Sequence, residues 1–406
     1  MPRAHVATAA LLALALTVGA CGDDESTTPK TPEVQIGALD SGNHNTTPID
    51  VERARTPESG SIREAIRIGA VTPLMVDIDN RLIFNSSAVF NRRLITPTFP
   101  PDVFVSTEVG PEEFNAVAPG LIAGWYSSGQ RREKAELGRT ATLHTLRFGD
   151  ATLAGTALRA LADRTAGTEY AIPGHPETAA KASIGNSLRP PAVDAWSAHN
   201  DMLIHVRVED PLSVPVDPAP MAELAGRIID RQIEMLSAYA PTPIDKIATQ
   251  PLDVDGILSR VPLYEKNDLP VIGANPWGVY PRQVALQAEE QPHLARPAFA
   301  DAGVEFLAIG NAVLVYRTQD NASTTRLIAA LRSMIVDEDI YQKADSPPNL
   351  PSAQCVEAKP NTTSTSRTRP LCWVPIGRDI AQVTGQNLQD THQRIAAQYK
   401  LMVADR

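Results

Sequence analysis

The sequence lacks the short motifs that mark the commonest catalytic and phosphate-binding loops. It contains no G-x-S-x-G nucleophile elbow, no H-E-x-x-H helix, no G-x-x-x-x-G-K-[ST] loop and no S-x-x-K pair. The stretch "DVDGIL" begins like a calcium loop, but its glycine comes too early and the closing glutamate is absent. We therefore predict no catalytic residue, no metal ligand and no cofactor, and we expect a protein that is not an enzyme.

The sequence also lacks an excess of basic residues and is poor in aromatic ones. It has 37 Lys and Arg against 47 Asp and Glu, a formal net charge of −10. This balance argues against broad nucleic-acid binding and against electrostatic attraction to anionic lipid head groups. Hydrophobic residues make up 43% of the chain but aromatic ones only 5%. We expect a sizeable core built mainly from Ala, Val, Leu and Ile.

Long apolar runs are missing as well. The run from Val6 to Val18 follows a short basic start and is too short to cross a hydrocarbon core of roughly 30 Å. A basic start, a short apolar run and small residues after it are typical of a signal peptide. No other segment reaches the 18 or so consecutive apolar residues that a membrane span needs.

One of only three cysteines lies at the end of this segment. The order Val18-Gly19-Ala20-Cys21 resembles a bacterial lipobox, in which the cysteine thiol is lipidated and becomes the new N-terminus. We predict a signal peptide over residues 1–20 and a lipid anchor at Cys21. The protein would then lie on the outer face of the plasma membrane. An ordinary secretory signal with an incidental cysteine is the alternative.

The other two cysteines, Cys355 and Cys372, bracket a polar loop rich in Ser, Thr and Pro. In an oxidising, exported compartment such a pair indicates a disulfide. A metal site is the alternative, but no C-x-x-C or C-x-x-H spacing supports it.

Composition and pattern divide the mature chain into three parts. Residues 21–50 are polar, with scattered proline and little periodicity, and we interpret them as a flexible tether. We assign 51–265 to an N-terminal α+β domain and 266–406 to a C-terminal α+β domain with the disulfide loop.

Two stretches 110 residues apart resemble each other. Residues 199–210, "HNDMLIHVRVED", and 309–320, "IGNAVLVYRTQD", each place a turn-forming pair before an alternating apolar strand, so that Arg207 matches Arg317 and Asp210 matches Asp320. A strand-like segment precedes each turn and a helical stripe follows each strand. We predict an α+β fold of antiparallel sheets with helices packed on them, containing a duplicated helix–hairpin–helix unit. Chance similarity of two amphipathic hairpins is the alternative.

Two further helices follow from capping and periodicity. Ser61 and Glu64 have the spacing of a capping box at the start of "SIREAIRIGAV". Near the C-terminus, an apolar stripe recurs at intervals of four and three residues and predicts a helix packed on the core. Its members are Leu388, His392, Ile395, Tyr399 and Met402.

Four side chains are weak candidates for a functional site. His175 and Glu177 lie in "PGHPE", where flanking prolines indicate an exposed loop. His199 and His205 flank the first predicted turn and could bind a metal with Asp201, but Arg207 beside them would repel a cation. His205 matches Val315 in the second stretch, so it also fits an ordinary half-buried strand position.

Two segments at opposite ends of the mature chain show a resemblance to a known family. "ALDSGNHNTTP" (38–48) is similar to the opening of a family of actinobacterial exported lipoproteins of unknown function, although His44 replaces a tyrosine. The ending, "LPSAQC…LCWVPIGRDIAQVTGQNLQDTHQRIAAQYKLMV", resembles that family's paired-cysteine segment, with Asp379 where an aromatic residue is usual. The resemblance implies an anchor at Cys21, a Cys355–Cys372 bridge and a smaller C-terminal domain. It supplies no catalytic residue.

The sequence therefore predicts a lipid-anchored envelope protein that binds a small or lipidic ligand or another envelope protein. Its partners would be the membrane, through Cys21, and that ligand or protein, but not nucleic acid. One alternative is an envelope scaffold or sensor partner. The other is a hydrolase of envelope material that uses His175, Glu177 or His205.

Overall fold

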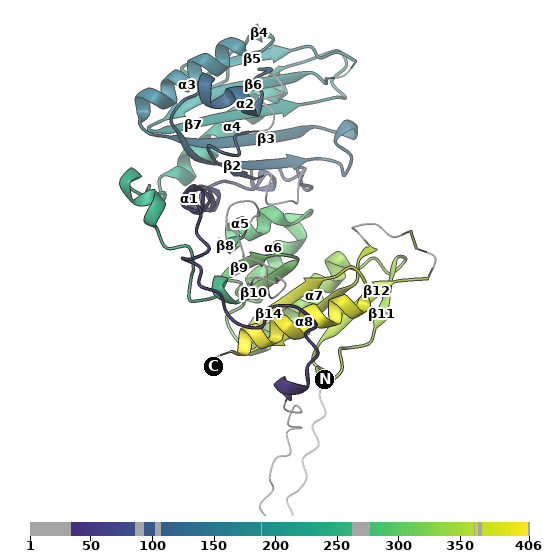
Figure 1. Cartoon of the computed structure of the whole chain (residues 1–406). Helices are drawn as coiled ribbons and strands as arrows, with labels where there is room; N and C mark the ends of the chain where they lie inside the picture. The colour runs from purple at the N-terminus through teal and green to yellow at the C-terminus, as the bar shows by residue number, and fades with distance from the viewer. Residues whose placement is uncertain are drawn as a thin grey trace, which may run out of the picture. The chain divides into compact units, whose positions relative to one another are not determined.

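A computed structural model describes residues 34–85, 93–101, 107–187, 189–261, 277–360, 362–363 and 368–404 (Figure 1). The predicted signal peptide, 1–20, and Cys21 lie outside these residues. Ile36–Arg406 form one compact unit. Its two sheets have seven strands each, all paired antiparallel, and both carry helices. The predicted α+β class is confirmed. Among the described residues, no helix combines the length and the hydrophobicity that a membrane span requires.

The first sheet has the strand order β1-β2-β3-β7-β6-β5-β4. The helices α2 and α3 lie over one face of it (Figure 1), while α1 and α4 pack on the other. The strands are Leu94–Ile95 (β1), Leu121–Gln130 (β2), Thr140–Phe148 (β3), Thr168–Glu169 (β4), Ala179–Ser183 (β5), Ala192–His199 (β6) and Met202–Glu209 (β7). The helices are Ser59–Ala70 (α1), Pro111–Val117 (α2), Ala151–Arg164 (α3) and Ala219–Leu236 (α4).

The second sheet has the order β11-β12-β13-β14-β10-β9-β8. The helix α8 lies over one face (Figure 1), and α7 packs on the opposite one. The strands are Gly278–Pro281 (β8), Phe306–Gly310 (β9), Val313–Arg317 (β10), Tyr341–Ala344 (β11), Gln354–Ala358 (β12), Leu371–Ile376 (β13) and Asp379–Thr384 (β14). The helices are Arg282–Ala288 (α5), Pro292–Asp301 (α6), Asn321–Ile335 (α7) and Leu388–Val403 (α8). Short 3-10 turns occur at Ile36–Ala38 (η1), Met75–Asp77 (η2), Ala135–Leu137 (η4), Ile244–Thr249 (η5) and Leu258–Arg260 (η6).

Both predicted hairpins are present, as β6–β7 and β9–β10, and a helix follows each of them. The helix α6 directly precedes the second hairpin, whereas β4 and β5 separate α3 from the first. The matched arginines have the same role, because each forms a buried cross-strand ion pair: Arg207 with Asp194, and Arg317 with Asp379 at 2.9 Å. The matched aspartates differ. Asp320 caps α7 by accepting the backbone N–H of Ser323 at 2.8 Å, whereas Asp210 forms an ion pair with Arg139 at 2.7 Å.

The capping box predicted at Ser61 and Glu64 is wrong, because α1 begins two residues earlier, at Ser59. Glu64 is instead fully buried and accepts a hydrogen bond from Arg147 Nη1 at 2.7 Å, from Arg67 at 3.0 Å, and from Tyr239 and Thr242. Burial opposes the charged form, but the hydrogen bonds from Thr242 and Tyr239 outweigh it and hold the pKa of Glu64 below its ordinary value.

The same helix touches the second half of the chain through close packing. Gly69 of α1 lies against the ring of Trp125, where a Cβ atom would come within 2.6 Å of the indole. The indole N–H of Trp125 donates to Gln287 of α5 at 2.7 Å, and the amide of Gln287 donates back to the Gly69 carbonyl at 3.0 Å. These buried contacts join α1, the first sheet and α5.

The predicted disulfide between Cys355 and Cys372 is present. The two residues lie directly opposite each other on β12 and β13, with Cα atoms 4.1 Å apart. Trp373, which follows Cys372, packs in the core with Leu327 of α7. Because side chains alternate along a strand, Cys372 faces the side that α8 covers.

Removing the Glu64 carboxylate should be strongly destabilising. Glu64→Ala leaves the buried Arg147 without its partner on α1, and we expect the free energy of unfolding to fall by about 3–5 kcal/mol in urea denaturation. The control is Glu52→Ala, which removes a carboxylate that is 61% exposed and paired with Arg55, and should cost less than about 1 kcal/mol. Equal losses in the two variants would contradict this role for Glu64.

Candidate functional site

The helix α8 provides the main wall of a surface pocket. It begins after Asn387, whose side chain accepts the backbone N–H of Asp390 at 3.0 Å. Ile395 and Met402 of the predicted stripe are buried, as expected. Leu388 and His392 are only half-buried and line the pocket instead. Tyr399 is half-buried as well, so the stripe predicted the core-facing side of the helix at Ile395 and Met402 but not at its other three members.

Residues 38–44, which we call the N-terminal strap, are held against α8. The side chain of Gln393 donates to the Asp40 carboxylate at 2.9 Å, and Lys400 Nζ donates to the Leu39 carbonyl at 2.9 Å. Leu39 is buried at 4% exposure. The strap lies within the segment that we predicted to be a flexible tether, but from Leu39 onward this part is packed on the helix.

Hydrogen bonds fix the charges of two carboxyl groups, Asp40 in the strap and Asp390 on α8. Gln393 and the backbone N–H of Gly42 hold the pKa of Asp40 below its ordinary value. Burial opposes the charge on Asp390, but donors from the Gln386 backbone and Arg394 outweigh it and lower the pKa of that carboxyl as well. Both groups are therefore carboxylates at neutral pH.

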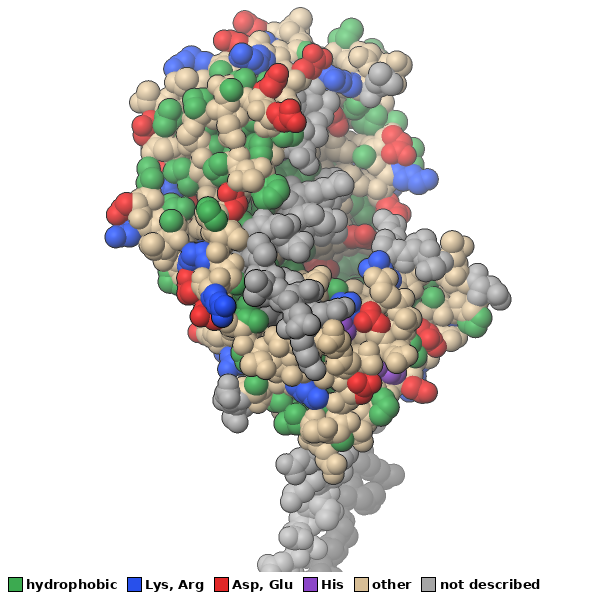
Figure 2. All heavy atoms as spheres, in the orientation of Figure 1, with side chains coloured by type: hydrophobic (Ala, Val, Ile, Leu, Met, Phe, Trp, Pro, Cys, Tyr) green, Lys and Arg blue, Asp and Glu red, His purple; other side chains and the backbone are tan. Residues whose placement is uncertain are grey.

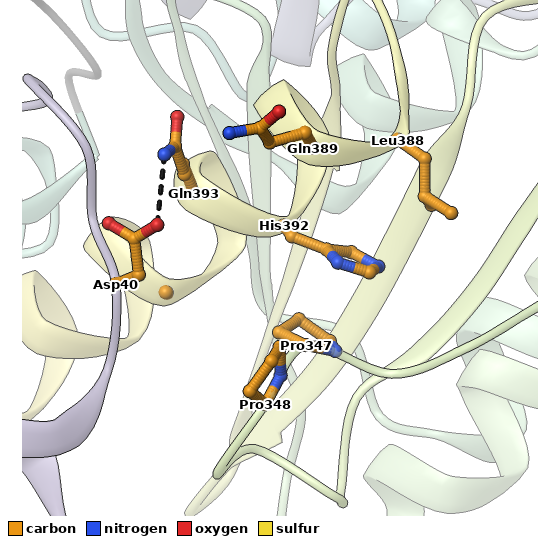
Figure 3. A pocket seen from close by; sticks show the side chains of 8 residues that line it. Asp40, Pro347, Pro348, Leu388, Gln389, His392 and Gln393 are labelled. Carbon is orange, nitrogen blue, oxygen red and sulfur yellow. Dashed lines mark hydrogen bonds between the residues drawn. The ribbon is translucent and has the colours of Figure 1, made fainter.

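The pocket lies between the strap, α8 and the Pro347–Pro348 turn (Figure 3). Its volume is about 340 Å³, at the lower end of the range of small-molecule sites. Apolar and polar side chains both line it. The lining residues are Asp40, Pro347, Pro348, Leu388, Gln389, His392, Gln393 and Ala396.

A hydrogen bond sets the orientation of His392. Its Nε2 lies 2.9 Å from the Asp345 carbonyl oxygen, which can only accept, so Nε2 carries the proton and donates. In the neutral ring Nδ1 is then left with a lone pair. The imidazole ring lies between Leu388 and Pro347 (Figure 3). His392 thus offers the pocket a fixed polar group.

Two of the four weak candidates belong to a loop beside α4. His175 Nε2 lies 3.2 Å from an Asp230 carboxylate oxygen on α4, so the histidine ties its loop to that helix. Glu177 is exposed. Neither residue lines the pocket at α8.

The other two candidates do not meet. His199 is opposite Met202 at the end of the hairpin, whereas His205 is opposite Trp196 and is 1% exposed. His205 Nε2 donates to Asp194 at 2.9 Å, and its Nδ1 lies 3.3 Å from Nδ1 of His144.

His144, which the sequence analysis missed, completes a buried chain of hydrogen bonds that runs from Asp194 through His205. We call this chain the buried relay. Because Nε2 of His205 gives its proton to a carboxylate, His144 must donate to His205 Nδ1. Burial lowers the pKa of both histidines, most strongly that of His144, so both rings are neutral at pH 7. At this depth the relay stabilises the sheet rather than forming an open site.

The visible charged groups are mixed in sign. On the face shown in Figure 2, the coloured Lys and Arg side chains are scattered among Asp and Glu and do not gather into one basic surface.

Comparisons with known proteins identify a family. Residues 51–252 match the N-terminal part, and residues 258–405 the C-terminal part, of a domain of unknown function (DUF7373). The two-part organisation implied by the resemblance is thereby confirmed. No curated protein matches the chain. Among solved structures, the extracellular domain of PknH from Mycobacterium tuberculosis aligns over 47% of this chain and 100% of its own, at 13% identity and a TM-score of 0.28.

The strap depends on a glycine that no other residue replaces without strain. Gly42 has φ +52°, and a Cβ there would lie 2.6 Å from the Gln393 side chain that holds Asp40. Gly42→Ala should therefore lower the free energy of unfolding by about 1–2 kcal/mol and speed amide hydrogen exchange in residues 38–44. Gly37→Ala is the matched control, because nothing lies within 4 Å of its added Cβ. Unchanged exchange of the strap in Gly42→Ala would contradict its docking on α8.

Proposed function

The chain belongs to the DUF7373 family, and we propose that it is an envelope protein, lipid-anchored at Cys21, that binds a small polar ligand in the pocket at α8. The pocket itself carries the proposal. It has the size of a small-molecule site, and its polar groups are held in place by hydrogen bonds within the protein.

The lining indicates the chemistry of the ligand. Asp40 is an exposed carboxylate that accepts a hydrogen bond from Gln393 and feels the charge of Lys400, and Gln389 adds a second amide group to the lining. Pro347 and Leu388 form apolar walls. These groups suit a small molecule with an amine or amide N–H at one end, which Asp40 accepts, and a short apolar part at the other.

The place of the pocket in the chain supports a role near the membrane. Asp40 lies nineteen residues after Cys21, and even a fully extended chain of that length reaches only about 65 Å. A lipid anchor at Cys21 would therefore keep the pocket near the membrane surface, where envelope metabolites diffuse. The two segments that carry the family resemblance, 38–48 and the C-terminal helix, supply six of the eight lining residues, and Pro347 and Pro348 supply the other two.

Native mass spectrometry of the full protein, extracted gently from cell envelopes, tests the ligand. We expect an added mass that disappears on denaturation and that is lost in Gln389→Trp, whose ring would fill the pocket. Arg159→Trp, at an exposed position of α3, is the matched control and should keep the added mass. A bare protein mass, or the same added mass in Gln389→Trp, would contradict the pocket as the binding site.

The anchor is tested separately. Cys21→Ser should release the protein from the membrane fraction and abolish labelling by an alkyne-tagged fatty acid, because two acyl chains make a stable anchor. Ser26→Ala, five residues further along, should leave both unchanged. If Cys21→Ser remained membrane-bound and labelled, the anchor would lie elsewhere.

A further inference from the structure

The disulfide lies beside a histidine on the helix that covers it. The Sγ atoms of Cys355 and Cys372 and a ring nitrogen of His392 all lie within 4.8 Å of one another. Both cysteines are buried, and His392 is half-buried. Two sulfurs and one imidazole form a donor set that soft and borderline metal ions prefer, zinc and copper(I) among them.

The two cysteines do not need the disulfide to stay together. They are opposite each other on β12 and β13, and the backbone ladder continues on both sides, with Gln354 opposite Trp373 and Val356 opposite Leu371. β13 is in turn paired along its whole length with β14. Reduction would therefore leave two thiols facing α8 at nearly the same positions.

A hydrogen bond fixes the position of the His392 ring. Its Nε2–H donates to the Asp345 carbonyl at 2.9 Å, an arrangement that fixes the ring and leaves Nδ1 available. Tetrahedral zinc sites place sulfur at about 2.3 Å and nitrogen at about 2.0–2.1 Å from the metal. Reduction removes the S–S bond, so that the two sulfurs can separate to coordinate one ion while His392 stays beside them.

We propose that reduction of this disulfide converts Cys355, Cys372 and His392 into a site for a divalent ion of the zinc class. A thiol reductant supplies two electrons and two protons, so that two thiols form and the reductant becomes a disulfide. The metal then binds two thiolates and His392 Nδ1, releases the two thiol protons and takes water as a fourth ligand. This metal site does not depend on the ligand proposed above. His392 nevertheless belongs both to the metal site and to the lining of the ligand pocket.

Cobalt(II) serves as the spectroscopic probe for this site. The full protein is titrated with Co²⁺ under anaerobic conditions, with and without a phosphine reductant. We expect one Co²⁺ per chain, with thiolate-to-cobalt charge-transfer absorption, only in the reduced protein, and displacement by Zn²⁺. His392→Ala should weaken Co²⁺ binding by more than about tenfold, since losing a ligand costs at least as much as losing its outer-shell partner. His175→Ala, half-buried and remote in the chain, should bind as the unaltered protein does.

Each other outcome overturns the proposal. Circular dichroism accompanies the titration. A reduced protein that keeps its fold but gives no charge-transfer band has no such site. A protein that unfolds on reduction lacks the preformed thiol pair on which the site depends. Equal binding in His392→Ala and His175→Ala would show that His392 is not a ligand. Gln389→Trp separates the two sites, because it blocks the pocket and leaves all three metal ligands in place.

Discussion

A single buried carboxylate fixes how the first helix meets the first sheet. Glu64 accepts hydrogen bonds from α1 itself, from β3 and from residues 239–242. Arg147 extends this network to Asp201 in the β6–β7 turn, at 3.0 Å. A buried charge is tolerated only when such partners surround it. With α1 held in this position, Gly69 packs against the ring of Trp125. The indole N–H of Trp125 in turn donates a hydrogen bond to Gln287 of α5.

In the second half of the chain, hydrogen bonds between distant segments likewise hold the pocket in place. The N-terminal strap crosses α8 because Gln393 and Lys400 bind it, and because Gly42 allows the close approach. These contacts join residues 38–44 to the C-terminal helix. In our account this junction is where a ligand binds, and the anchor at Cys21 keeps it near the membrane.

The sequence predicted the elements whose formation depends on residues close together in the chain. Alternation and turn-forming pairs predicted the hairpins at 192–209 and 306–317, periodicity predicted α8, and the paired cysteines predicted the disulfide. The remaining features depend on contacts between segments that are far apart in the sequence. Gln393 and Asp40 are 353 residues apart, and Glu64 and Thr242 are 178 apart. His144 joins His205 only through the register of β3 with β7. A single sequence does not give these long-range pairings, so the pocket and the relay were not predicted.

A crystal structure of the protein purified from cell envelopes, with no ligand added, tests the central claim most directly. Our account predicts electron density for a small organic molecule between the strap, α8 and the Pro347–Pro348 turn, with a nitrogen within hydrogen-bond distance of the Asp40 carboxylate. A pocket that holds only ordered water, or a strap that lies away from α8, would contradict it.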